Sequence, residues 1–480
     1  MTTHPAITAF DGRTWARIRR VALVLSVAAA LLSGAACRAT SSASLGGSSR
    51  PDTAAARQFS AWLAAFNADD QPALVAYHRQ SFPYEVANAD LGNREREAFL
   101  RHETGGLDLT KTEEVTPTRV IALVKEHNER RFARAVMEVA PAAPHPVVRF
   151  EFTRVPTPED LLTPEERIHA TLDDAKRRRL IEGIAGELQE HYVFPKVAEQ
   201  MIATLRAHAG RGDYDQLTRA EAFTAAVLKD LRDVSHDLHI RFVFGPRRPD
   251  FSEQTPEERL ANFRRMNFGF GPIERLPGNV ARLPIIAFYP LEREVRDAIE
   301  RSMTEVADAD ALLIDLRENH GGQPDTVALI LSYLFDPEPV HLTDIVWHFD
   351  GSTQQIWTVR DVPGPRFGRS KPVYVLTSRQ TISAGEGLAY DLKNLHRARV
   401  VGETTAGAAN PAAFHDLDDW FKIGVPGARA INPVTKTSWE GVGVVPDVAV
   451  PAGAALEAAR RLAVQDVSAM ARSAPPRHRR

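Results

Sequence analysis

The chain has 480 residues, of which 44% are hydrophobic and 25% charged, and its formal net charge is -3 at pH 7. These values are ordinary for a globular protein, and the length allows two or three domains with a large core. The nearly balanced charge gives no electrostatic basis for nucleic-acid binding, and the single cysteine, Cys37, excludes an intrachain disulfide.

The N-terminus has the order of segments found in signal peptides. Basic residues at 17–20 precede a short apolar run at 21–32, and small residues and Cys37 follow. We therefore expect residues 1–37 to be a signal peptide. A cysteine directly after Gly-Ala-Ala resembles a bacterial lipoprotein processing site, so Cys37 is a candidate lipidation site that would anchor the protein to a membrane. The alternative is an ordinary cleavage site, with a periplasmic or secreted product.

A disordered tether and a small α+β module are expected next. Residues 38–54 are rich in Ser, Gly, Thr and Ala, as flexible tethers are. Residues 55–155 combine one helical pattern with three strand patterns, at 55–66, 118–125, 133–139 and 147–154. The segment 102–124 resembles SnoaL-like modules, which have a cone-shaped α+β fold. No catalytic set is visible in the module, so we expect it to act as a spacer or in ligand recognition.

Helices and then alternating strands and helices make up the rest of the chain. Apolar residues with helical spacing predict a helical bundle over 161–245, interrupted by the motif HYVFP. Over 246–455 strands alternate with helices, which predicts an α/β core. The expected strands are 280–286, 311–316 and 371–377, and the expected helices are 291–306, 326–335 and 384–395. Residues 456–480 are expected to form a C-terminal helix and a basic tail.

Ser383 is the strongest candidate for a catalytic residue. It opens the helix expected at 384–395, just past the buried strand at 371–377. Unpaired N–H groups and the positive end of the helix dipole converge at such a position. A serine oxygen that attacks a carbonyl needs donors of this kind for the oxyanion that it creates. The alternative is a serine that only caps the helix.

Three further motifs contain candidate site residues. Gly321 and Gly322 follow a strand in ALLIDLRENHGG and let the backbone approach a ligand, or they only make a tight turn. His239, in VSHDLHIRF, lies where helix gives way to strand and is either a general base or a buried structural histidine. Glu440, in SWEGVGVVPDVAV, is either the carboxylate that orients an imidazole or an exposed loop residue. His236 and His239 lack the neighbouring ligands of a metal site, so we expect no metal and no other cofactor.

In this order the motifs resemble the C-terminal processing, or tail-specific, serine peptidases, and most closely their branch related to the interphotoreceptor retinoid-binding protein. The resemblance covers residues 161–450 and rests on HYVFPKVAEQM, DVSHDLHIRF, MNFGFGPIERLPGNVARL, ALLIDLRENHGG, YVLTSRQTISAGEGLAYDLK, VGETTAGAANP and WEGVGVVPD. It implies a crotonase-like (ClpP-like) α/β core with Ser383 as the nucleophile. It also implies oxyanion donors at Ala384 and at Gly321 or Gly322.

The sequence departs from that family in two places. Many members have a catalytic lysine in the block that aligns with VGETTAGAANP, where this chain has none. Tricorn-like members use histidine and glutamate instead, and the matching blocks contain His239 and Glu440. The resemblance therefore implies a Ser383–His239–Glu440 triad, with His415 as the alternative base. The segment between Phe244 and Gly278 is too short for the PDZ domain found in many members.

The expected function is that of an exported serine peptidase, of the endopeptidase or C-terminal processing type. It would hydrolyse peptide or protein substrates through an acyl-enzyme, and it would have no nucleic-acid partner. Two alternatives remain open at this point. One is a catalytically silent protein that binds lipid or peptide on the same fold, as the retinoid-binding relatives do, and the other is a hydrolase that does not act on peptides.

Overall fold

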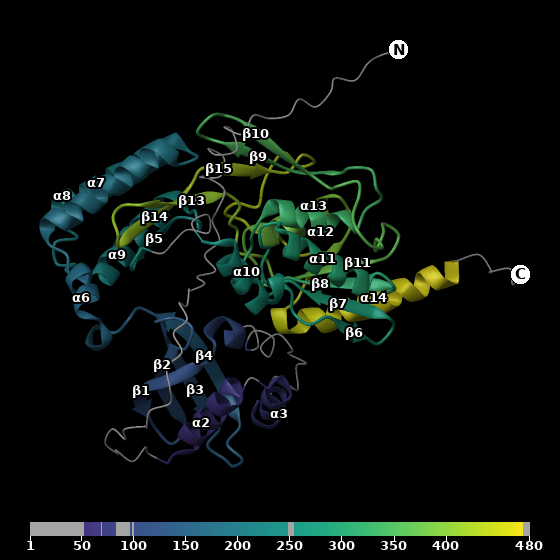
Figure 1. The fold of residues 1–480 in the computed structure, drawn as a ribbon, viewed down its shortest axis with the longest axis horizontal. Coiled ribbons are helices and arrows are strands. Elements are labelled where there is room, and N and C mark those ends of the chain that lie inside the picture. The colour runs from purple at the N-terminus through teal and green to yellow at the C-terminus, as the bar shows by residue number, and fades with distance from the viewer. Residues whose placement is uncertain (1–51, 69, 83–96, 98–99, 248–253, 474–480) are drawn as a thin grey trace, which may run out of the picture.

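The computed structural model describes residues 52–473 apart from 69, 83–96, 98–99 and 248–253. The predictions of a signal peptide, of lipidation at Cys37 and of a basic tail lie outside the described residues, as does most of the predicted tether. Within the described part of the chain, no helix is long and apolar enough to cross a membrane. Figure 1 shows three parts: an α+β module below, a helical bundle on the left and an α/β core on the right.

The N-terminal module is an antiparallel sheet in the order β1-β2-β3-β4 packed with helices, and the predicted helix and three strands are all present among its described residues. Its elements are α2 (Ala54–Asn67), α3 (Gln71–Ser81), β1 (Leu107–Val115), β2 (Arg119–Glu126), β3 (Phe132–Val139) and β4 (Val147–Val155). Phe59, Trp62 and Phe66 of α2 pack on the buried face of this sheet. The likeness to SnoaL-like modules stays a prediction.

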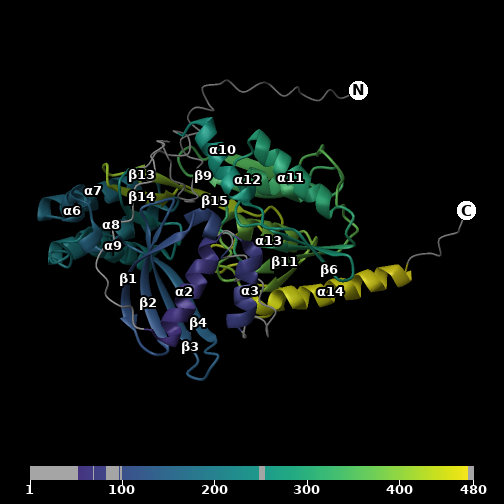
Figure 2. The same ribbon diagram turned by 60° about the horizontal axis from the view of Figure 1, so that its bottom comes forward.

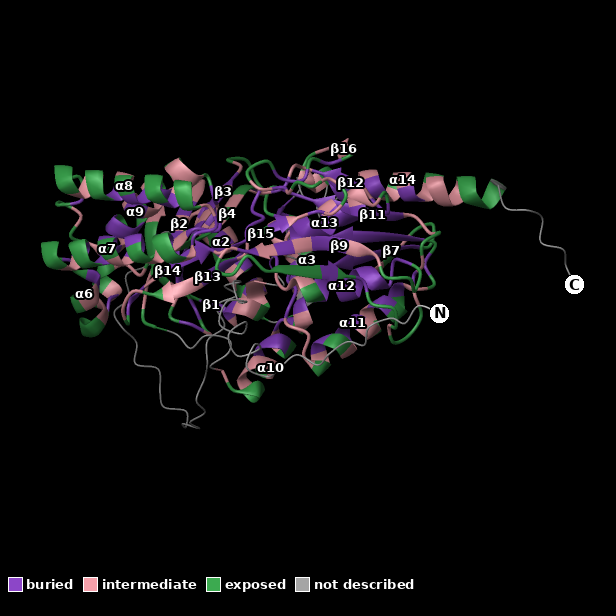
Figure 3. Ribbon diagram, turned by 90° about the horizontal axis from the view of Figure 1, so that it is seen from above, coloured by how far each residue is buried: buried purple, intermediate pink, exposed green. Residues whose placement is uncertain are grey.

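The helical bundle is completed by a small sheet from later in the chain. Its helices are η1 (Glu159–Leu161), α6 (Pro164–Ala170), α7 (Asp174–His191), α8 (Pro195–Arg211) and α9 (Ala220–Ser235). The sheet has the order β13-β14-β5 and contains β13 (Ala412–Asp416), β14 (Phe421–Pro426) and β5 (Arg241–Phe244). Phe421, Ile423 and Val425 of β14 share one hydrophobic cluster with the helices. In Figure 3 the outer faces of α7 and α8 are exposed.

The core is a six-stranded sheet in the order β16-β12-β11-β8-β7-β6, parallel except for the β6–β7 pair. Its strands are β6 (Glu274–Leu276), β7 (Val280–Pro284), β8 (Ala311–Asp315), β11 (Val373–Thr377), β12 (Arg399–Gly402) and β16 (Val448–Ala449). Helices cover one face: α11 (Arg293–Val306), α12 (Pro324–Ser332) and α13 (Ala384–Asn394). The long helix α14 (Ala452–Ser473) covers the other face (Figure 2). The central strands β7, β8 and β11 are wholly buried because both faces are covered.

A fourth sheet, in the order β10-β9-β15, lies beside the helical face of the core (Figure 1). Its strands are β9 (His341–Trp347), β10 (Thr353–Trp357) and β15 (Ala428–Ile431). The described residues between β5 and β7 form only α10 (Pro256–Arg265), η2 (Asn267–Gly269) and β6. The mixed α/β architecture agrees with the fold expected from the sequence, although β9, β10 and β15 were not predicted.

Candidate active site

Ser383 lies where the sequence places it, at the residue before α13, shortly after strand β11. Its backbone has φ 59° and ψ -123°, which is a strained conformation for a residue with a side chain. Strain of this kind persists only where the surroundings hold it, and it is common at functional sites. The fold therefore holds Ser383 in a conformation that ordinary helix caps do not adopt.

Glu386 holds this turn in place, and the sequence analysis did not identify it. Its carboxylate is fully buried and accepts four hydrogen bonds. The donors are the Ser383 amide at 2.8 Å, the Ala408 amide at 2.9 Å, the Gly407 amide at 2.7 Å and the Thr405 hydroxyl at 2.5 Å. One side chain thus fastens the start of α13 to the loop at 405–408.

Gly321 and Gly322 form the facing wall of the site. A Cβ atom on Gly321, at φ 86°, would lie 2.7 Å from the Cβ of Ser383. A Cβ on Gly322 would lie 2.1 Å from the carbonyl oxygen of Phe288, so neither position has room for a side chain. The Gly321 amide donates to Asn319 Oδ1 at 2.7 Å. The amides of Gly322 and Ala384 have no partner among the described residues, and both residues line the same cavity as Ser383.

The position of this glycine turn is fixed by a buried ion cluster at the end of β8. Asp315 accepts hydrogen bonds from Arg282 Nε at 2.9 Å and from Arg317 Nε at 2.9 Å, and all three side chains are buried. Burial alone would raise the pKa of Asp315, but the Arg317 and Arg282 guanidinium groups hold it well below its usual range. The cluster therefore stays ionised and anchors the turn that leads to Gly321.

His239 reaches the same cavity from the other side. It lies between α9 and β5, as predicted, and it lines the cavity together with Ser383. Burial, and to a smaller extent Arg241, lower the pKa of His239 to about 4, so the ring is neutral at pH 7. The structure contains no hydrogen bond between His239 and Ser383. Bonds of this type often tighten only when substrate is bound.

Two carboxylates stand next to His239, where the sequence analysis identified only one. A ring nitrogen of His239 and one oxygen each of Asp237 and Glu440 all lie within 4.8 Å of one another. His239 Nδ1 and Glu440 Oε1 are both buried without a hydrogen-bond partner. Burial, together with the charge of Asp237, raises the pKa of Glu440 to about 8. Glu440 lies in a turn.

The two carboxylates have different partners. Asp237 accepts from the His239 backbone amide at 2.9 Å and from Asn410 Nδ2 at 3.2 Å, so it positions the histidine segment. Glu440 Oε2 accepts from the amides of Ala409 at 2.5 Å and Asn410 at 3.1 Å, which leaves Oε1 facing the cluster. Glu440 is thus the carboxylate with an oxygen available to the imidazole.

His415, the alternative base, lies elsewhere. It stacks on His191 with ring centroids 4.3 Å apart, and its Nδ1 lies 2.9 Å from Glu187 Oε2. Burial and the neighbouring His191 lower its pKa to about 4. His415 is absent from the residues that line the Ser383 cavity, so the structure favours His239 over His415 as the neighbour of the serine.

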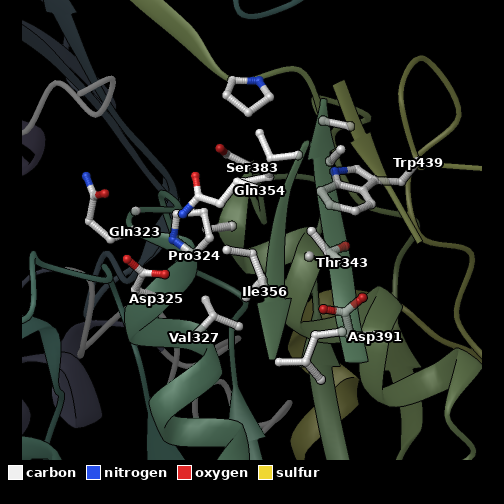
Figure 4. A pocket seen from close by; sticks show the side chains of 18 of the residues that line it. Gln323, Pro324, Asp325, Val327, Thr343, Gln354, Ile356, Ser383, Asp391 and Trp439 are labelled. Carbon is white, nitrogen blue, oxygen red and sulfur yellow. The ribbon is translucent and has the colours of Figure 1, made fainter. Parts of the chain in front are cut away.

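The cavity that unites these residues has a volume of about 150 Å³ (Figure 4). His239, Gly322, Ser383 and Ala384 lie on its wall, and α12, α13 and the β10-β9-β15 sheet supply most of the rest. Residues that carry a hydroxyl, a neutral imidazole and two unpaired amides thus line one small space. This set can activate an alcohol as a nucleophile and bind the oxyanion that forms on a carbonyl.

Comparison with known proteins identifies two consecutive domains. Residues 279–450 match the family described as peptidase family S41, and residues 171–267 match the N-terminal domain of peptidase S41 in eukaryotic IRBP. Carboxyl-terminal-processing peptidase 2, chloroplastic, of Arabidopsis thaliana is 30% identical over 209 residues, which cover 41% of this chain and 38% of that protein.

A second relative and a solved structure have weaker matches. The C-terminal processing peptidase, chloroplastic, of Tetradesmus obliquus is 30% identical over 153 residues, covering 32% of this chain and 31% of that protein. The chain therefore spans 38% of the length of the first curated relative and 31% of the length of the second. The structure of the photosystem II D1 C-terminal processing protease has 16% identity and a TM-score of 0.39, and the match covers 61% of this chain and 98% of that one.

Proposed function

The chain carries both domains of peptidase family S41, and on this premise we propose that it is a serine peptidase that cleaves peptide bonds through an acyl-enzyme. The observation that supports this most is the shared cavity, in which a strained serine faces two unpartnered amides and a buried histidine. No residue of the cavity is a lysine, so the base of the reaction is assigned to His239 instead of to a Ser–Lys dyad.

In the proposed reaction His239 takes the proton from Ser383, and the serine oxygen attacks the peptide carbonyl. The Gly322 and Ala384 amides donate to the oxyanion of the tetrahedral intermediate, because they have no competing acceptor. Glu440 accepts from the imidazole and holds its tautomer. His239 then protonates the leaving amine, and water hydrolyses the acyl-enzyme.

Two finer proposals concern location and organisation. We propose that the protein is exported, with Cys37 as the lipidated residue, on the basis of the basic, apolar and small residues in 1–37. The mature chain would then be periplasmic or anchored at a membrane.

We also propose the division into a module at 55–155, a bundle at 161–245 and a core at 246–455. The separate hydrophobic clusters support this division, and β14 extends the bundle.

Fluorophosphonate labelling of the purified chain tests the activity. We expect wild type to be labelled, Ser383→Ala not to be labelled, and His239→Ala to be labelled at least about 100-fold more slowly. Two matched controls, His415→Ala and the exposed Ser352→Ala, should be labelled like wild type. A folded wild-type chain that resists labelling would refute the proposal and favour a silent binding protein.

A further inference from the structure

The cavity continues from Ser383 along one face of helix α13. Ser383, Gly387 and Asp391 are spaced four residues apart, so they follow one another down the helix, and all three line the cavity. Eight residues of helix rise by about 12 Å. Gly387 has no side chain, and the Trp439 ring packs close to it, since a Cβ atom there would lie 3.2 Å from the indole. In Figure 4 Ser383 is at the upper end of the cavity and Asp391 is at the lower right.

Apolar side chains line the space between these two ends. They come from α12, from β9 and β10, and from the loop before Glu440, and they include Val327, Leu342, Ile345, Ile356 and Trp439. An occupant must therefore present an apolar stem to this middle section. The walls are rigid, because each of these residues belongs to the main hydrophobic cluster of the core.

Asp391 is a buried acid that has no cationic partner among the described residues. Its side chain is buried, and Asn432 Nδ2 donates to its Oδ1 at 3.0 Å. Burial raises its pKa well above the usual value, and hydrogen bonding offsets only part of this effect. No ion pair reaches Asp391 among the described residues, and the cavity lining includes a second acid, Asp325, but neither lysine nor arginine. A buried carboxylate without a counter-ion is costly, and a cation placed beside it would lower that cost.

We propose that this cavity receives the substrate side chain on the acyl side of the scissile bond, and that Asp391 makes it select lysine or arginine. Such a side chain combines an apolar stem with a cationic end, which matches the apolar walls and the acidic floor. The inference rests on the proposed function, because it needs Ser383 to be the attacking residue. Asp391 acts by binding the substrate and takes no part in the bond-making steps.

Peptide substrates that differ only in this side chain test the proposal. We expect kcat/KM for lysine and arginine to exceed that for norleucine, the uncharged analogue of lysine, by about 100-fold or more. Asp391→Asn keeps the shape and the bond from Asn432, and it should abolish this preference while norleucine cleavage persists. Asp325→Asn is the matched control, which removes the other carboxylate of the cavity and should keep the preference. Equal or better cleavage after norleucine or leucine by the wild type would overturn the proposal.

A binding measurement separates this inference from the proposed function. Titration calorimetry of the Ser383→Ala chain with benzamidine needs no catalysis, and we expect saturable binding that Asp391→Asn abolishes. If wild type is labelled by the fluorophosphonate but no benzamidine binds, only the assignment of Asp391 is refuted, and the proposed peptidase function stands. Benzamidine binding without labelling would support the cation site and refute the peptidase.

Discussion

Replacement of Glu386 should damage the fold and the site together, because this carboxylate holds the turn that carries Ser383. Its two oxygens accept four hydrogen bonds, and the residue is 0% exposed, so water cannot replace a lost acceptor. Glu386→Gln keeps one oxygen and places an NH₂ group against two of the four donors. A buried donor without an acceptor costs about 1–3 kcal/mol, so the expected loss of unfolding free energy is about 2–6 kcal/mol.

Urea denaturation of the core measures this loss, with Glu403→Gln as the control. Glu403 lies in the neighbouring loop, is only partly buried and accepts one long bond from the Arg379 amide at 3.3 Å. The control should change the unfolding free energy by less than about 0.5 kcal/mol. The same Glu386→Gln protein should be labelled more slowly by a fluorophosphonate, because the Ser383 amide loses its acceptor. The reasoning would be refuted if the unfolding free energy fell by less than about 1 kcal/mol while its slope against urea concentration stayed unchanged.

Three further predictions follow from the geometry. Asp315→Asn removes the charge that pairs two buried arginines and should lower the unfolding free energy by about 3–5 kcal/mol, and a urea midpoint equal to that of wild type would contradict this. Peptidase activity on an uncharged substrate should rise as the pH passes about 8, because ionised Glu440 accepts a stronger, charge-assisted hydrogen bond from His239 than protonated Glu440 does. Glu440→Gln should lack this rise, and a wild-type profile that is flat across this range would exclude the assigned pKa. Gly322→Ala places a Cβ against the Phe288 carbonyl and displaces an oxyanion donor, so fluorophosphonate labelling should slow by about 100-fold or more, and an unchanged rate would remove Gly322 from the oxyanion site.

The parts of the fold that were predicted correctly are those with strong local patterns. The strands β7, β8 and β11 are mostly apolar because they are covered on both faces, and the helices after them have clear apolar periodicity. Ser383 and His239 were predicted as site residues because each stands where one hydrophobic pattern gives way to another. The change is from strand to helix at Ser383 and from helix to strand at His239. The β10-β9-β15 sheet was missed because its strands mix buried and exposed residues, and because β15 pairs with β9 across a long stretch of chain.

The rest of the site depends on contacts that spacing cannot reveal. Asp237 lies two residues before His239, but its importance comes from Asn410, which is 173 positions later. Asp391 is a polar residue on a helix and would ordinarily face solvent, yet the β10-β9-β15 sheet covers it. His415 has the residue type expected of a base, and only the register of β13 directs it to His191 instead of to Ser383.

The place of β14 in the sheet beside β5 has a consequence for the order of folding. Strand β5 precedes the core in the chain, whereas β14, its partner, follows nearly all of it. The bundle therefore cannot complete its hydrophobic cluster until residues 421–426 have been synthesised. Pairings between such distant segments form late in folding. Because β5 follows His239 directly, the histidine is fixed opposite Ser383 only in a nearly complete chain. An unfinished or truncated chain then lacks the assembled cavity that brings His239 and Ser383 together.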